Sequence, residues 1–181
     1  DFEYVQQALQ NQACDYILKP IDKSKLSELL NKISKKIFKE KKELQNRYLQ
    51  SLLNHISSQT PYSNKTVENY FHETPFFTCI YFHEGSYPVN PYLYLTTDNY
   101  FWTTDLILSA VSALLLPEEQ VWLLQGTYSK EHFIIIGHPI NQPQRCTELV
   151  HSLFQHFLAS PHSITCIASM IPLSLDKLQD T

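Results

Sequence analysis

The sequence predicts an α+β protein: a short helix, a brief strand and a long helix, followed by an α/β sandwich with a largely antiparallel sheet. Three observations predict this fold class. Beyond Pro75, short apolar runs that suit strands alternate with two amphipathic helical stretches. The runs at 120–125 and 132–137 are separated by a short turn, which favours an antiparallel hairpin. Apolar residues make up 43% of the chain and charged residues 18%, a globular composition.

The first segment, residues 1–22, contains a helix and a strand by pattern. Residues 2–10 repeat apolar side chains at helical spacing, namely Phe2, Val5, Ala8 and Leu9. A brief apolar strand is expected in "CDYILKP", residues 14–20, and it ends in the pair Lys19-Pro20. Asp22 follows at once and is a residue type that caps helix N-termini. The sequence therefore predicts that a helix begins directly after this segment.

That helix is predicted to be long, covering residues 23–57. Its apolar residues recur at spacings of three, four and seven, and no proline or glycine occurs before Pro61. A helix of about 35 residues rises roughly 50 Å, too far to bury one stripe within a small domain. We therefore expect a homodimer in which the stripe pairs with a second copy as a coiled coil. The predicted dimer seam consists of Leu30, Ile33, Ile37, Leu44, Tyr48 and Leu52.

Charge is distributed unevenly along the chain, which indicates differently built parts. Residues 23–47 hold nine basic and three acidic side chains, a net charge of +6, whereas residues 48–181 hold four basic and eleven acidic ones, a net charge of −7. The basic run could contact nucleic acid, but a solvated outer helix face is the favoured interpretation, because charges fill the positions between apolar residues. Polar, turn-rich residues 58–75 are predicted to form a connector, with a short helix at 67–71.

Residues 76–181 are predicted to form the α+β domain. Strands are expected at 76–82, 92–95, 120–125, 132–137 and 164–169, helices at 103–116 and 143–158, and a short helix within 173–180. Both longer helices carry one apolar face, so we expect them to cover the same face of the sheet.

Cysteine and histidine usage favours a chain without metal or disulfides. The four cysteines form no CxxC pair, which is typical of a reducing, cytoplasmic compartment. No apolar run of about 18 residues predicts a membrane span, and the first residues do not resemble a secretory signal. His151 and His156 differ by five positions, which places them off one helical face, so no metal site is predicted. No G-x-S-x-G motif places a nucleophile, and no catalytic residue is predicted.

The opening stretch "DFEYVQQALQNQACDYILKPID" resembles the end of a receiver domain. The similar receivers belong to YesN-like response regulators, which are fused to AraC-type DNA-binding modules. The resemblance covers the receiver's fourth helix, fifth strand and the start of its fifth helix. It implies that Lys19 senses the phosphoryl group on an aspartate, that Pro20 follows a cis peptide bond, and that Tyr16 is the switch aromatic.

The resemblance does not cover the phosphorylation site of a receiver domain. In the family, the Mg²⁺-binding acidic pair, the phosphorylated aspartate and a Ser/Thr lie on earlier strands, and "DFEYVQQALQNQACDYILKPID" matches only the part that follows them. We therefore expect no cofactor in this fragment and Mg²⁺ only in the complete receiver.

The sandwich resembles, more weakly, the middle region of YesN-type regulators, which is similar in topology to a degenerate diguanylate cyclase. Where such cyclases carry Gly-Gly-Asp/Glu-Glu-Phe, this chain reads "GTYSKEHF" from Gly126 to Phe133, with Lys130 near the position of a metal-binding carboxylate. We therefore expect no catalysis here.

The resemblance implies part of a phosphorylation-dependent transcriptional regulator, whose partners are a sensor histidine kinase and promoter DNA. This fragment would carry dimerisation and signal transmission. A small-molecule sensor domain and a divergent nucleotide cyclase-like enzyme stay as alternatives.

Overall fold

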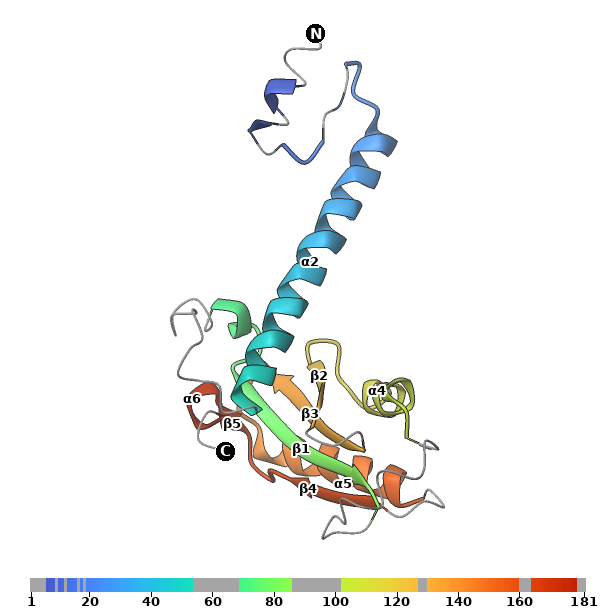
Figure 1. Cartoon of the computed structure of the whole chain (residues 1–181), viewed down its shortest axis with the longest axis vertical. Helices are drawn as coiled ribbons and strands as arrows, with labels where there is room; N and C mark the ends of the chain where they lie inside the picture. The colour runs from blue at the N-terminus through green and yellow to red at the C-terminus, as the bar shows by residue number, and fades with distance from the viewer. Residues whose placement is uncertain are drawn as a thin grey trace. The chain divides into compact units, whose positions relative to one another are not determined.

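The computed structural model describes residues 6–8, 10–11, 13–15, 17, 19–53, 69–85, 102–126, 130–159 and 164–178. The chain divides into two compact units, Asp1–Leu44 and Gln45–Thr181 (Figure 1). Helix α2, Lys23–Leu53, begins in the first unit and ends in the second. The composition and pattern of the sequence predict that the α+β domain begins at residue 76, about thirty residues after the start of the second unit.

Helix α2 begins where the capping pattern predicts. The backbone N–H of Ser24 donates to Asp22 Oδ1 at 2.8 Å, which satisfies one of the free amides of the first turn. The helix continues without interruption to Leu53, and the predicted residues 54–57 lie outside the described part.

The strand predicted before Lys19 is not present in the described residues. Residues 13–15 and 17 have no regular secondary structure, whereas residues 6–8 and 10 are helical, as predicted. A strand is stable only when its backbone groups pair with a neighbour, and no described residue supplies such a neighbour for this segment.

The second unit is built on a sheet in which all pairings between the described strands are antiparallel. Its strands are β1 (Phe76–Glu84), β2 (Gln120–Gln125), β3 (Glu131–His138), β4 (Ile164–Ala168) and β5 (Leu173–Ser174). The order is β2-β3-β1-β4, with β5 also paired to β1. The prediction of a largely antiparallel sheet in an α+β fold is confirmed. The predicted strand at 92–95 lies outside the described residues.

The described helices that follow β1 along the chain are α4 (Thr104–Ser112), α5 (Pro143–Leu158) and α6 (Leu175–Leu178). The succession β1-α4-β2-β3-α5-β4 is the split-βαβ arrangement. Helix α5 has the predicted bounds, with a proline in its first turn. Helix α4 is shorter than predicted: it ends at Ser112, and a tighter turn follows in which Leu114 N–H donates to the Val111 carbonyl.

Helices α4 and α5 pack on one face of the sheet, as predicted. The core there is apolar and fully enclosed, and it joins both helices to the central strands; it includes Ile80, Phe82, Ile107, Val111, Ile134, Ile136, Leu149, Leu153 and Phe157.

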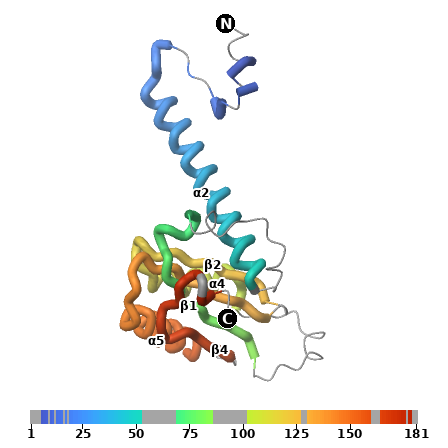
Figure 2. Tube along the Cα trace, turned by 90° about the vertical axis from the view of Figure 1, so that its left-hand side faces the viewer, coloured from blue at the N-terminus to red at the C-terminus, as the bar shows by residue number. Residues whose placement is uncertain are grey.

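The opposite face of the sheet is covered by the end of α2 and by α6 (Figures 1 and 2). Its core contains Tyr48, Leu49, Phe71, Phe77, Trp122, Leu124, Ile135 and Leu178. The Phe71 and Trp122 rings meet edge to face, with centroids 5.6 Å apart. The predicted connector 58–75 therefore supplies a core residue, Phe71, to this domain.

This packing corrects two residues of the predicted dimer seam. Tyr48 is only 7% exposed and Leu52 packs against the same core, so both side chains face the chain's own sheet. The apolar residues of α2 have the same spacing before and after residue 44. Only the residues after it pack against the sheet, which the spacing alone does not reveal. Leu30 and Ile37 are 58% and 59% exposed, and Ile33 and Leu44 are half-buried. For these four residues the seam stays a prediction.

Candidate functional site

The Lys19–Pro20 peptide bond is cis, the geometry that the receiver resemblance implies. Both residues are exposed beside a hollow of about 440 Å³ in the first unit. The hollow is lined by Asp15, Ile17, Lys19, Pro20, Asp22, Lys25 and Leu29. Tyr16 lies outside the described residues, and the roles of Lys19 and Tyr16 stay predictions.

This hollow brings together charges that the sequence did not connect. Lys25, from the first turn of α2, lines it together with Lys19, Asp15 and Asp22. One carboxylate is already used, because Asp22 caps the helix. An ammonium group can form charge-assisted hydrogen bonds to phosphoryl oxygens, so Lys19 and Lys25 are the groups here that suit an anion.

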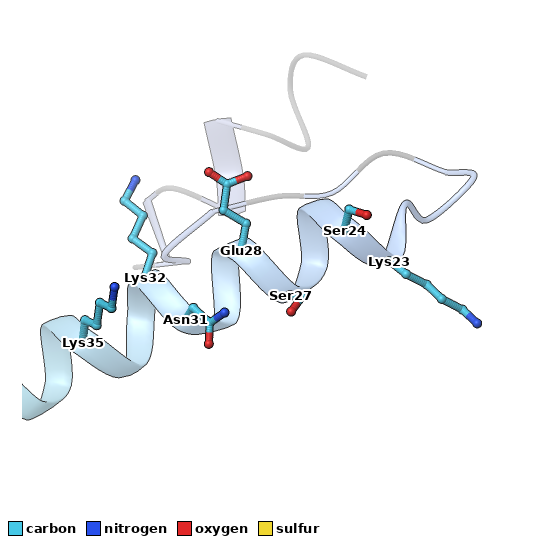
Figure 3. Close-up of a pocket in the computed structure, with 7 residues that line it drawn as sticks. All are labelled: Lys23, Ser24, Ser27, Glu28, Asn31, Lys32 and Lys35. Carbon is cyan, nitrogen blue, oxygen red and sulfur yellow. The ribbon is translucent and has the colours of Figure 1, made fainter.

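A second, more open depression of about 800 Å³ follows the polar side of α2 (Figure 3). It is lined by Lys23, Ser24, Ser27, Glu28, Asn31, Lys32 and Lys35. All these residues are exposed and belong to one helix, so among the described residues only α2 lines the depression. Farther along, Lys36–Glu40 and Lys39–Glu43 form ion pairs at 3.9 and 3.8 Å, and exposed pairs of this kind contribute little. This side of α2 fits the solvated face that the sequence favours.

The end of the sheet at which β2 leads into β3 contains Gly126 and Glu131, from the stretch for which the sequence suggested a resemblance to cyclases. Gly126 N–H donates to the Glu131 carbonyl at 2.9 Å, and a Cβ at Gly126 would lie 2.5 Å from that of Glu131. Only glycine permits so close an approach. The Glu131 carboxylate accepts a hydrogen bond from the Tyr81 hydroxyl at 2.9 Å. Residues 127–129 of the turn lie outside the described part.

Several buried titratable groups flank this end of the sheet. His83 and Glu84 end β1, and His132 lies on the neighbouring strand. Burial lowers the pKa of His83 and of His132, with nearby carboxylates opposing the shift, so neutral imidazoles are favoured. Glu84 accepts a hydrogen bond from the Trp102 amide at 3.1 Å. Within the described ranges, no three His, Cys, Asp or Glu side chains are grouped to hold a metal ion.

A buried polar network that the sequence did not reveal lies near the other end of β1. Its centre is Glu119, whose carboxylate accepts hydrogen bonds from Arg145 at 2.6 and 3.0 Å and from the Leu116 amide at 2.8 Å. His138 Nδ1 lies 2.9 Å from the same carboxylate. Burial on its own raises the pKa of Glu119, but these hydrogen bonds outweigh it and lower that pKa.

The network continues through His138 to a hydroxyl and a thiol. His138 Nε2 lies 2.7 Å from Thr78 Oγ1, which donates to Cys146 Sγ at 3.0 Å. A carboxylate, an imidazole and a hydroxyl in series also activate nucleophiles in enzymes. Here Thr78 and Cys146 are fully buried and His138 is 4% exposed, so no substrate could reach the hydroxyl. The network therefore fastens β1, β3 and the start of α5 together.

The residues of this network are far apart in the chain, which explains why the sequence did not connect them. Glu119 and Arg145 read as surface charges, and Thr78 as a polar residue within a strand. Only the register of β1 with β3, which pairs Phe76 with His138, brings Thr78 beside the imidazole.

Comparison with protein-family models, with curated proteins and with solved structures found no match to this chain. Among the described residues, no helix has the length and apolar character needed to cross a membrane.

Proposed function

We propose that this chain connects the phosphoryl-sensing end of a receiver domain to an α+β domain, as part of a dimeric, DNA-binding two-component response regulator. In this proposal the fragment carries signal transmission and dimerisation and has no catalytic role. The partners of the complete regulator are a sensor histidine kinase and promoter DNA.

One observation carries the proposal: α2 joins the motif to the domain core without a break. Its cap, Asp22, lies two residues after the cis bond at Pro20, and Tyr48 and Leu49 on its last turns are buried in the core of the second unit. A helix with a core residue at its end transmits displacement of its start, because its backbone hydrogen bonds keep it from shortening.

The mechanism follows from the position of Lys19. A phosphoryl group on a neighbouring aspartate would attract the Lys19 ammonium. Lys19 shares its hollow with Lys25, which belongs to the first turn of α2. Movement of Lys19 would therefore change the contacts of that turn. Local electrostatic changes of this kind bias two-state elements in phosphorylation switches.

The test uses the complete regulator, with the sequence on both sides of this chain, treated with a small-molecule phosphodonor. We expect Lys19→Ala to abolish the phosphorylation-dependent gain in promoter binding while phosphorylation itself continues. Lys35→Ala, which removes another exposed ammonium, on the polar side of α2, is the matched control and should leave the gain intact. An unchanged gain in Lys19→Ala would contradict the proposal.

Two alternatives stay as hypotheses. A cyclase-like enzyme would be supported by turnover of GTP with Mg²⁺, although Glu131 is engaged by Tyr81 and Lys130 stands at the turn. A sensor domain would be supported by thermal stabilisation of the chain by a nucleotide or metabolite.

A further inference from the structure

Among the described residues, strand β4 lies at an edge of the sheet. The order β2-β3-β1-β4 gives it one neighbour, β1. Ser169 N–H donates to the Cys79 carbonyl at 2.9 Å, while Glu84 N–H donates to the Lys130 carbonyl on the β3 side. Backbone groups alternate in direction along a strand, so Thr165 and Ile167 bond to β1. Those of Ile164, Cys166 and Ala168 point outward and have no partner within the described residues.

The composition of β4 does not protect this edge. Its sequence, ITCIA, contains no charge and no proline, which are the usual means by which edge strands avoid pairing. Ile167 is 62% exposed on the strand. The opposite edge differs, since Gln50 of α2 donates to the outward carbonyl of Gln125 at 3.0 Å.

An apolar groove runs beside the same edge. It has a volume of about 310 Å³ and lies between α5 and β4, lined by Phe154, Leu158, Ile164, Thr165 and Cys166. Leu158, one of these lining residues, is 70% exposed. Outward backbone groups and exposed apolar side chains thus occur at one place.

The outward N–H and carbonyl groups of β4 can pair with the same groups of a second copy of the strand. A two-fold axis perpendicular to the sheet at Cys166 turns the strand antiparallel to its copy and sets every outward N–H opposite an outward carbonyl. Because β4 carries no charged side chain, no like charges meet across the axis. The same rotation keeps each sheet face on its own side, so the two apolar grooves adjoin.

We propose that β4 is an interaction surface for a second copy of this chain, with the two β4 strands pairing antiparallel about Cys166. Cys166 then faces Cys166 of the second copy, and Ile164 faces its Ala168. On the face opposite α5, Thr165 lies directly opposite Ile167 of the second copy, with Cα atoms about 4.5 Å apart. This pairing is independent of the predicted α2 seam.

Register-specific disulfide formation in the full chain tests the proposal. Every protein carries Cys14→Ser and Cys166→Ser, because Cys14 is exposed and Cys166 would lie opposite its own copy at the axis. Burial raises the pKa of Cys79 to about 12 and also raises the pKa of Cys146, which disfavours their reactive thiolates. Proteins carrying Thr165→Cys and Ile167→Cys are then mixed and oxidised. A Cα separation of about 4.5 Å is within disulfide range, so we expect the mixture to form several-fold more covalent dimer than either protein alone.

The matched control mixes Thr165→Cys with Ile171→Cys, which is 60% exposed but four positions out of register. This mixture should stay at the background level of covalent dimer. Equal yields in the two mixtures would overturn the proposal, and a strand from another protein would then be the candidate occupant.

A second measurement does not depend on new cysteines. Ile167→Lys adds a charge to the edge and should lower the mass of the assembly in sedimentation, whereas Ile140→Lys, at an isoleucine 60% exposed, should not. Persistence of the wild-type mass in Ile167→Lys would likewise overturn the proposal. Carrying out both measurements in a Leu30→Asp, Ile37→Asp chain separates this surface from the seam.

Discussion

Glu119 holds a guanidinium and an imidazole at once, and its side chain is only 2% exposed. Breaking a buried ion pair by removing one partner costs more than the pair contributes, because the other charge stays buried without compensation. Arg145 also donates to the Leu114 carbonyl at 2.7 Å, so the network fixes the segment between α4 and β2.

We expect Glu119→Ala to lower the free energy of unfolding by about 3 to 5 kcal/mol. The measurement is urea denaturation at pH 7. Glu118→Ala removes an exposed neighbouring acid and should change stability by less than about 0.5 kcal/mol. Similar losses in the two variants would show that the network does not stabilise the fold.

The lowered pKa of Glu119 also gives this network a pH dependence with a definite sign. Its stabilisation is complete above the ordinary glutamate pKa of about 4.3, and it is lost as the pH falls through the lowered value of the folded state. Glu119→Gln should remove this part of the acid-induced loss in the same assay.

Among single residues, the sequence predicts the roles of those whose partners are close to them in the chain. Asp22 caps α2 because its partner, Ser24, is two positions away. The network was not predictable because Thr78, Glu119 and His138 meet only after the sheet has formed. A glutamate is almost never fully buried unless it is paired, so the sequence alone favours an exposed position for Glu119 and does not identify its partners.

For helices and strands, the spacing of apolar residues predicts most of the elements that the structure contains. The strands at 120–125 and the helix at 143–158 were predicted because each has one clear periodicity and a turn or proline at its ends. The end of α2 was misassigned because its stripe continues in phase from Leu44 to Tyr48, and a stripe does not specify whether a sheet or a second helix covers it.

Replacing an apolar side chain of α2 by alanine should therefore destabilise the protein by different amounts before and after residue 44. Leu49 is fully buried against the sheet, so Leu49→Ala should cost about 2 to 5 kcal/mol in chemical denaturation. Phe38 is 62% exposed on the same helix, and Phe38→Ala should cost less than about 0.5 kcal/mol. Equal costs would contradict the division of α2 at residue 44.

For the whole molecule, the first part of α2 presents apolar side chains that its own unit leaves exposed. Leu30 and Ile37 are seven residues apart and share one side of the helix. Isolated exposed leucines are common on proteins, but a repeat of seven is the spacing by which helices pair.

We expect Leu30→Asp combined with Ile37→Asp to abolish a concentration-dependent dimer formed through this seam, as measured by sedimentation velocity. Charges at both positions would be buried at the interface without partners. Ser24→Asp with Asn31→Asp adds the same charges at the same spacing on the polar side shown in Figure 3 and should leave the dimer unchanged. A seam variant with the wild-type sedimentation profile would remove the coiled-coil prediction.

The burial of Tyr48 and Leu49 has a practical consequence for anyone isolating the C-terminal domain. A gene boundary drawn at residue 58 or 76, as the composition of the chain suggests, would remove the helical cover over Phe77 and Trp122. The shortened product would expose large aromatic side chains to water and should aggregate on expression. Cloning from a position ahead of Gln45 keeps that cover in place.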